Sequence, residues 1–223
     1  MVPWLVFGAA AGLFSGWIEQ HYLGAKGQDF ELPFLARRLV AGRAIWFYLG
    51  KLVWPFDLNF IYPRWTSDAA VWWQWLFPLG VLALVAALWF LRQWTRAPLA
   101  AWLFFVGSLF PVLGFVNLYG AFYKFVWDHW QYLPGLGLIA PAAVGLVQAR
   151  NWAAIRMRGA GPALMALLGG ILGALTWNHC RMFRDDQTLF RATLARNPGA
   201  WMAHFNLGDI LLRIPRREPE AIA

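Results

Sequence analysis

Long apolar stretches without a single charged side chain divide this sequence, and they decide which folds are open to it. A helix that crosses a bilayer needs about 20 mostly apolar residues. Four stretches approach this length, and a fifth opens the chain: residues 71–91, 98–119, 131–147, 161–177 and 2–18. Blocks of this kind predict an all-α fold, a polytopic transmembrane helical bundle.

The stretch at residues 39–56 fits this pattern only in part. It is apolar and aromatic, yet it contains Arg43 and Lys51. An arginine or lysine at mid-bilayer costs about 3 kcal/mol by insertion scales. We therefore interpret the segment as an interfacial or re-entrant helix that ends at Pro55, with a sixth span as the alternative. The sequence predicts five spans, or six if this segment crosses.

Composition supports the membrane class and argues against several others. The chain is 60% hydrophobic and 13% charged, and it has 16 tryptophans, which favour membrane interfaces. Its net charge of +8 comes from scattered Lys and Arg with no basic stripe, which argues against nucleic acid. The lone Cys180 has no CxxC or CxxH partner, and His21, His179 and His204 have none at ligand spacing. We predict a bilayer as partner and no metal, and no pattern identifies a cofactor.

The short loops predict the orientation. Arg92 and Arg96 lie in one loop and three arginines lie within residues 150–158, with no acidic residue in either loop. Two spans separate the loops, so both face one side, which the positive-inside rule makes cytoplasmic. The nearly neutral loop around residues 124–128 and everything after residue 177 then face the exoplasm.

Small residues predict which spans pack together. Gly169 and Gly173 form a GxxxG step, and Gly137, Pro141 and Gly145 recur at four-residue spacing on the preceding apolar stretch. Small residues let helix backbones approach closely in a membrane. We expect these two helices to pack against each other.

The composition changes after residue 177, which divides the chain into a transmembrane domain, 1–177, and a tail, 178–223. Asp185 or Asp186 is placed to cap a helix through QTLFRATLAR, which stops at Asn197-Pro198. A second periodic segment, AWMAHFNLGDILLR, follows. Two short helices with this punctuation predict a helical-repeat unit.

The tail resembles a tetratricopeptide repeat. The residues that match its pattern are Pro198, Leu207, Gly208, Leu211 and Ala221. The interval from Gly208 to Ala221 is one residue longer than the repeat normally has. One unit cannot bury its own apolar face, so either further repeats follow or the hairpin packs on the membrane domain. An ordinary amphipathic helix pair is the alternative. The resemblance implies a concave, partner-facing position for Asn206.

Three segments extend the resemblance over residues 6–223: GRAIWFYLGKLVWPFDLNFIYPRW, FPVLGFVNLYGAFYKFVWDHWQYLPGLGLIAP and DDQTLFRATLARNPGAWMAHFNLG. Together they resemble bacterial membrane proteins that join a glycosyltransferase-C-like domain to tetratricopeptide repeats. These proteins are similar to the tetratricopeptide-containing O-mannosyltransferases. The resemblance implies transfer of a sugar from a polyprenyl-phosphate donor to an acceptor that the repeats recruit. The acidic catalytic loop of the family has no match here, so we assign no catalytic residue.

The segment WDHWQYLP corresponds to a family motif, Asp-Arg-Tyr-x-Tyr-Leu-Pro. The matching residues are Asp128, Tyr132, Leu133 and Pro134. His129 stands where an arginine is common, and an arginine would bind a lipid phosphate through two parallel hydrogen bonds. We predict that His129, helped by Lys124, contacts the donor phosphate. The alternative is an aromatic belt at a helix end, with Asp128 capping a span that Pro134 kinks.

Arg64 in IYPRW, residues 61–65, poses the same choice. Its aromatic neighbours, Tyr62 and Trp65, favour a membrane interface, and the orientation argument puts it on the same face as His129. We predict contact between Arg64 and the donor phosphate, with ordinary snorkelling as the alternative.

These observations predict part of a membrane glycosyltransferase that modifies a protein or another acceptor with a sugar such as mannose. Residues 1–17 lack the charged start of a secretory signal, and the chain opens on a span, which indicates the C-terminal portion of a longer enzyme, inactive alone. The expected location is a bacterial inner membrane, with the tail in the periplasm. The alternative function is a non-catalytic, membrane-anchored repeat scaffold.

Overall fold

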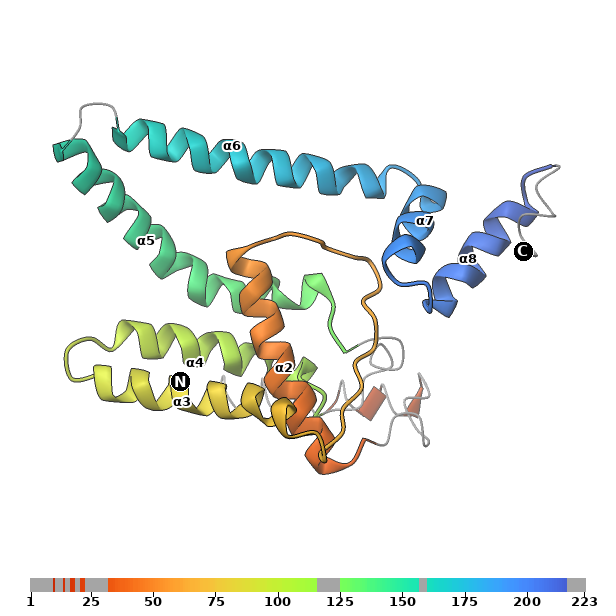
Figure 1. Ribbon diagram of the computed structural model, residues 1–223, viewed down its shortest axis with the longest axis horizontal. Helices are drawn as coiled ribbons and strands as arrows, with labels where there is room; N and C mark the ends of the chain where they lie inside the picture. The colour runs from red at the N-terminus through yellow and green to blue at the C-terminus, as the bar shows by residue number, and fades with distance from the viewer. Residues whose placement is uncertain are drawn as a thin grey trace.

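The computed structural model describes residues 32–115, 125–156 and 160–215, together with Ala10, Phe14, Trp17, Ile18, His21 and Tyr22. Every regular element in the three ranges is a helix (Figure 1). The α-helices are α2 (Phe34–Val53), α3 (Leu76–Leu91), α4 (Ala97–Leu109), α5 (Tyr132–Arg156), α6 (Ala160–Cys180), α7 (Asp186–Arg196) and α8 (Trp201–Leu212). Short 3-10 turns precede or follow them: η1 (Trp72–Trp75), η2 (Phe110–Val112), η4 (Asp128–Gln131) and η5 (Arg181–Phe183). The all-α prediction is confirmed for these residues.

Three continuous helical segments are long and apolar enough to cross a membrane: Trp72–Leu91, Asp128–Trp152 and Ala160–Phe183. Only 6%, 11% and 6% of their most apolar windows are buried inside the protein. Apolar surface of this extent is not stable in water, so it indicates association with a membrane. A further apolar helix, Ala97–Val112, is shorter, and most of the first expected span lies outside the described residues. The count of five or six spans therefore stays a prediction.

The helices do not end where the apolar stretches end. The stretch at 131–147 continues as α5 to Arg156, and the stretch at 161–177 continues as α6 to Cys180. Backbone hydrogen bonds hold a helix together regardless of side-chain polarity, so a helix can extend beyond its apolar section. The stretch at 98–119 does the opposite: α4 ends at Leu109, and the chain turns at Gly114 with φ of 88°.

The C-terminal end of α5 and the N-terminal end of α6 lie at the same end of the molecule as the α3–α4 connection, and α7 lies at the other end (Figure 1). We call these the arginine end and the tail end. The arrangement agrees with the prediction that both arginine-containing loops face one side. Which side is cytoplasmic stays a prediction.

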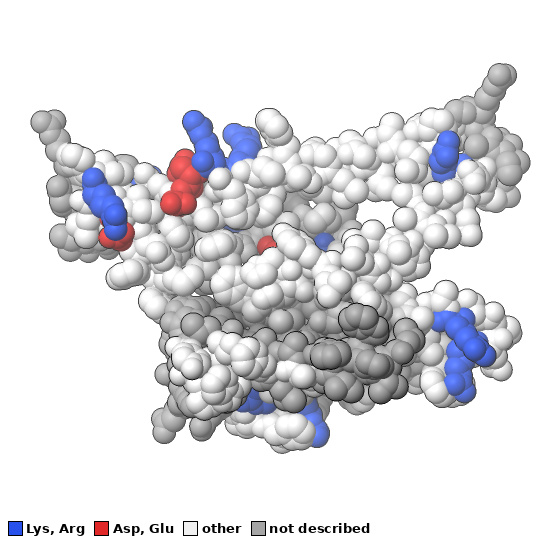
Figure 2. All heavy atoms as spheres, turned by 180° about the vertical axis from the view of Figure 1, so that it is seen from behind, with Lys and Arg blue, Asp and Glu red and all other residues white. Residues whose placement is uncertain are grey.

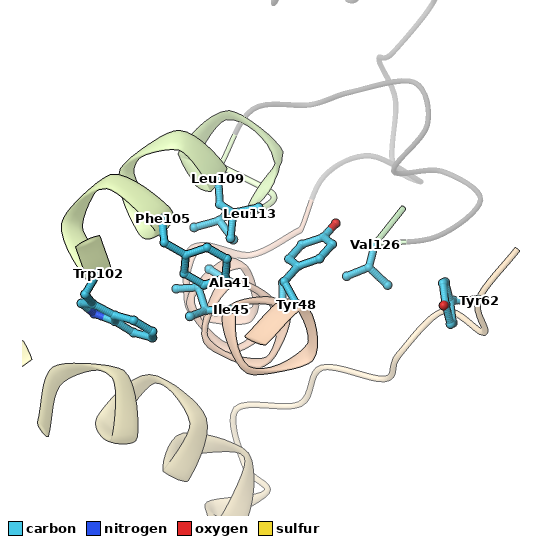
Figure 3. Close-up of a cluster of buried hydrophobic side chains, with 10 residues drawn as sticks. Ala41, Ile45, Tyr48, Tyr62, Trp102, Phe105, Leu109, Leu113 and Val126 are labelled. Atoms are coloured by element: carbon cyan, nitrogen blue, oxygen red, sulfur yellow. The ribbon is translucent and has the colours of Figure 1, made fainter. Parts of the chain in front are cut away.

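Helix α2 lies at the tail end and crosses α3 and α4 instead of running alongside them (Figure 1). Figure 3 looks along α2 and shows Ala41, Ile45 and Tyr48 facing Phe105 and Leu109 of α4. Tyr48, Phe105 and Leu109 are completely buried. Helix α2 carries four charged residues and is not among the three candidate spans, so the choice between an interfacial helix and a sixth span stays a prediction.

Two of the four charged residues of α2, Arg37 near its start and Lys51 near its end, contact the backbone of neighbouring segments. Arg37 Nη1 donates to the Gly114 carbonyl at 2.6 Å, in the turn that follows α4. Lys51 Nζ donates to the carbonyls of Phe56 and Asp57, at 2.6 and 3.0 Å. The accepting carbonyl groups lie outside the helices, where helical hydrogen bonds do not satisfy them, so these side chains supply their partners. They tie α2 to the loops on either side of it.

A backbone contact at Gly42 joins α2 to α3. A Cβ atom on Gly42 would lie 2.6 Å from Pro78 N and 2.9 Å from Pro78 Cα, closer than atoms can approach. One helical turn further on, Trp46 Nε1 donates to the Phe77 carbonyl at 3.0 Å. The contact requires a glycine on α2, because any side chain would push the helices apart.

Helices α5 and α6 contact each other, as predicted, but the small residues that suggested this contact do not form it. Gly137 packs on α4, where its Cβ position would lie 2.7 Å from Phe104 Cδ1 and 3.0 Å from the Ala101 carbonyl. Gly145, Gly169 and Gly173 have no atom within 4 Å of their Cβ positions. Spacing along one helix shows that backbones can approach, but it does not identify which helix approaches.

The tail forms two helices, as its punctuation predicts. Asp185 accepts hydrogen bonds from Thr188 N at 2.7 Å and Thr188 Oγ1 at 2.9 Å, so it is the residue that caps α7. The Thr188 backbone N–H, with its hydroxyl, holds the pKa of Asp185 below its ordinary value. Helix α7 ends at Arg196, before Asn197-Pro198. The match at Ala221 lies outside the described residues, so the assignment as a tetratricopeptide repeat stays a prediction.

The Gly42 contact predicts opposite outcomes for two glycine-to-alanine changes in α2. Gly42→Ala should destabilise the protein by about 1–3 kcal/mol, because the new methyl group meets the Pro78 backbone. Gly50→Ala should stabilise it by about 0.5–1 kcal/mol, since Gly50 has open space around its Cβ position and alanine favours a helix. Chemical unfolding in detergent micelles, followed by circular dichroism, measures both. Equal effects of the two changes would contradict the proposed contact.

Candidate functional site

One hydrogen bond joins the two segments that the sequence singles out. The Tyr62 hydroxyl, in IYPRW, donates to Asp128 Oδ1, in WDHWQYLP, at 2.9 Å. The same hydroxyl accepts the Asn59 backbone N–H at 3.0 Å. Tyr62 and Asn59 are only 7% and 4% exposed. A hydrogen bond to a carboxylate in such surroundings is stronger than one in water, so it holds the two segments in a defined position.

The environment keeps Tyr62 protonated. Burial raises the pKa of its phenol, and the negative charge of Asp128 raises the pKa further. The hydroxyl therefore remains protonated, and a donor, near neutral pH. Its role is structural, because a phenol held in this form does not take up a proton from a substrate.

A second tyrosine joins WDHWQYLP to α2. The hydroxyl of Tyr48 accepts the Trp127 backbone N–H at 3.1 Å, and neighbouring Val126 is 1% exposed. Two tyrosines from different segments thus hold consecutive residues, Trp127 and Asp128. The start of η4 is therefore held by α2, through Tyr48, and by the loop that follows α2, through Tyr62.

The alternative for WDHWQYLP, an aromatic belt with a helix cap, is confirmed only in part. The rings of Trp127 and Trp130 lie 5.9 Å apart, so the aromatic cluster exists. Trp127 is the residue that precedes η4, and it makes no side-chain cap bond, while the Asp128 carboxylate bonds to Tyr62. Pro134 lies near the start of α5, directly after η4, and the kink expected at this proline stays a prediction.

Arg64 lines a cavity between the loop that follows α2, here residues 61–64, and the tail. Its guanidinium carbon is 5.0 Å from the centre of the Phe125 ring, and the side chain is exposed. The cavity has a volume of about 250 Å³, and the α7–α8 turn lines its other side with Asn197, Gly199 and Trp201. A ligand in this cavity would touch both Arg64 and the tail.

His129 projects from η4 on the exposed side of the same segment. Its ring centre lies 5.5 Å from that of Trp127 and 6.1 Å from that of Trp130. Tyr132 and Leu133 are 73% and 61% exposed. Lys124, the predicted helper of His129, lies outside the described residues.

The tail is fixed to the loop that carries Arg64. Asn197 Nδ2 donates to the Ile61 carbonyl at 3.2 Å, and Arg196 Nε forms an ion pair with Asp57 Oδ1 at 2.9 Å. Ile61 also packs with Ala200 and Ala203 in a small apolar core. The tail therefore packs on the membrane domain around Ala200 and Ala203, while Phe205 and Leu212 of α8 stay exposed.

Asn206 is half-buried on α8, and its amide Nδ2 donates to the Met202 carbonyl at 2.7 Å, one turn earlier in the same helix. The predicted contact of Asn206 with a peptide partner is not tested by this geometry. Among the residues that the structure describes, no three His, Cys, Asp or Glu side chains gather in a way that holds a metal ion.

Sequence reasoning missed the residues that assemble this site. Asn59 and Asn197 carry no motif signal, and Tyr62 was noted only as an aromatic neighbour of Arg64. One clue was available, since Tyr48 and Tyr62 are tyrosines in apolar surroundings and a buried hydroxyl needs a partner. The identity of that partner depends on how distant segments pack.

Comparison with known protein families, with curated proteins and with solved structures finds no match to this chain.

The Tyr62 bond predicts a contrast between two tyrosines. Tyr62→Phe should lower the free energy of unfolding by about 1–3 kcal/mol, because Asn59 N–H and Asp128 lose a buried partner. Tyr132→Phe should change it by less than about 0.5 kcal/mol, since that ring is exposed. Urea unfolding in mild detergent, followed by tryptophan fluorescence, measures both. If the two variants unfold alike, the Tyr62 hydroxyl does not hold the segments together.

Proposed function

We propose that this chain is part of a membrane glycosyltransferase and that its tail end contacts the phosphate of a polyprenyl-phosphate-linked sugar. One observation carries the proposal: the hydrogen bond between Tyr62 and Asp128 holds the segments of Arg64 and His129 side by side. Each segment was assigned to phosphate contact by a separate sequence argument. The contact between the two segments supports a ligand shared by Arg64 and His129.

The chemistry of the two side chains suits a lipid phosphate. A guanidinium binds two phosphate oxygens through parallel N–H bonds, and an imidazole adds one or two more donors. The stacking of Arg64 on Phe125 orients the guanidinium plane before the ligand arrives. Such donors stabilise the leaving phosphate as the sugar departs. Lys124 belongs to the same proposal.

The tail has a place in this function. The cavity beside Arg64 is bounded on one side by the loop and on the other by the α7–α8 turn. An acceptor held by the tail would be close to the donor phosphate. The transferred sugar, such as mannose, and the acceptor, a protein or another molecule, are part of the proposal. So is the location of the tail in the periplasm of a bacterial inner membrane.

A second candidate function is a membrane-anchored repeat scaffold without catalysis. The observation that favours it is the exposed apolar side of α8, where Phe205 is 69% exposed and Leu212 is 56% exposed. Surfaces of this kind mark protein contacts. This function requires no phosphate contact at Arg64.

Binding of radiolabelled polyprenyl phosphate to the purified chain in detergent tests the proposal. The wild type should bind it in a saturable way, and polyprenol, which lacks the phosphate, should not compete. Arg64→Gln should weaken binding about tenfold, the loss expected for a charge-assisted bond. The matched control is Arg181→Gln, an exposed arginine that follows α6 at the same end. Its affinity should stay within about twofold of the wild type.

His129→Arg should keep or increase the affinity, because arginine adds donors in the position that the family motif gives it. Loss of binding in this variant, with the melting temperature unchanged, would contradict the role of His129. Equal weakening by Arg64→Gln and Arg181→Gln would show a general charge effect. A folded protein that does not bind polyprenyl phosphate at all would favour the scaffold.

A further inference from the structure

The opposite end of the molecule has a charge pattern that the proposed function leaves unused. Residues 71–115 contain two charged side chains, Arg92 and Arg96, and the sequence has no acidic residue between Asp68 and Asp128. Figure 2 shows Lys and Arg atoms at the tip of the α3–α4 hairpin with no Asp or Glu atoms beside them. The hairpin cannot neutralise these two charges with its own residues.

A cavity of about 790 Å³ lies at this tip. Arg92, Gln93 and Arg96 line its polar part, and Phe90 and Leu103 line its apolar part. Phe90 and Leu103 are 69% and 52% exposed on the outer surface of α3 and α4. The cavity therefore has hydrogen-bond donors at the end of the hairpin and an apolar wall that continues toward the membrane.

Arg92 is oriented by an aromatic ring. Its guanidinium carbon lies 3.5 Å from the centre of the Trp89 ring, a cation–π contact at close range. Stacking leaves the N–H groups at the edge of the guanidinium plane open to a phosphate. An arginine that only snorkels to the interface needs no such contact and no cavity beside it.

We propose that this cavity binds an anionic glycerophospholipid of the surrounding leaflet, such as phosphatidylglycerol. Its phosphate accepts hydrogen bonds from Arg92 and Arg96, and Gln93 adds a polar side chain at the level of the headgroup. The first part of an acyl chain lies against Leu103 and Phe90. Basic pockets beside transmembrane helices bind anionic headgroups in this way. A soluble phosphate would leave the apolar wall without a partner.

The lipid site does not depend on polyprenyl phosphate binding at the tail end, because the two sites share no residue. The lipid site also has its own physical consequence. A lipid that bridges the end of α3 and the start of α4 stabilises the hairpin by mass action, since the unfolded hairpin has no such cavity.

Binding of phosphatidylglycerol to the purified full chain in dodecyl maltoside tests the proposal. Titration monitored by native mass spectrometry should show one saturable lipid per chain, and phosphatidylcholine should bind at least about tenfold more weakly. Arg92→Gln should weaken phosphatidylglycerol binding about tenfold. The matched control is Arg150→Gln, which removes one exposed arginine from α5 near the same end. Its binding should stay within about twofold of the wild type.

Three outcomes would overturn the proposal. The first is equal weakening by Arg92→Gln and Arg150→Gln, which would make the effect a general one of charge. The second is displacement of the lipid by millimolar inorganic phosphate or glycerol phosphate, which would identify a soluble anion as the ligand. The third is equal binding of phosphatidylcholine. A circular dichroism spectrum and melting temperature equal to those of the wild type confirm that the fold of each variant is intact, which is expected because both arginines are exposed.

Discussion

The contact between α2 and α3 at Gly42 is the constraint on which the rest of the tail end depends. Because the backbone of α2 touches that of Pro78, the helix is held across the end of the bundle, and its buried face meets α4. Tyr48 then reaches Trp127, and the loop after α2 begins where Asp128 can be contacted. A separation of α2 from α3 would change the position of every one of these groups.

From α2, a continuous series of contacts leads to the tail. Tyr48 holds Trp127, Asp128 holds Tyr62, and Ile61 next to Tyr62 holds Asn197. Each link is a hydrogen bond in buried or partly buried surroundings, where it is stronger than at a free surface. The tail is therefore held on the membrane domain at the end of α7. A ligand that contacts both the loop and the tail meets a surface whose shape is already formed.

The two ends of the molecule differ in what their positively charged side chains contact. At the tail end, positive groups have protein partners: Arg196 pairs with Asp57, and Lys51 donates to two carbonyls. At the arginine end, Arg92 contacts an aromatic ring, and its hairpin contains no acidic residue. Charges satisfied by protein stabilise a fold, whereas charges left to the surroundings attract an anionic partner. Arg64, which lies over the Phe125 ring at the tail end, and Arg92, which lies over the Trp89 ring at the arginine end, are the side chains proposed to contact an anionic lipid at each end.

The sequence by itself determined the helical fold class, the approximate positions of the described apolar helices and the end of α7, and it narrowed the cap of α7 to Asp185 or Asp186. These features depend on local hydrophobicity, on capping and on proline, all of which act over a few residues. It also pointed to Arg64 and His129, although it assigned neither a confirmed role. Only the tertiary structure decided that Gly137 packs on α4 and not on α6, that α2 lies across the bundle, and that Tyr62 bonds to Asp128. Such pairings join residues up to 136 positions apart, as Ile61 and Asn197 show, and no local pattern encodes them. They follow from which surfaces fit together once all the helices exist.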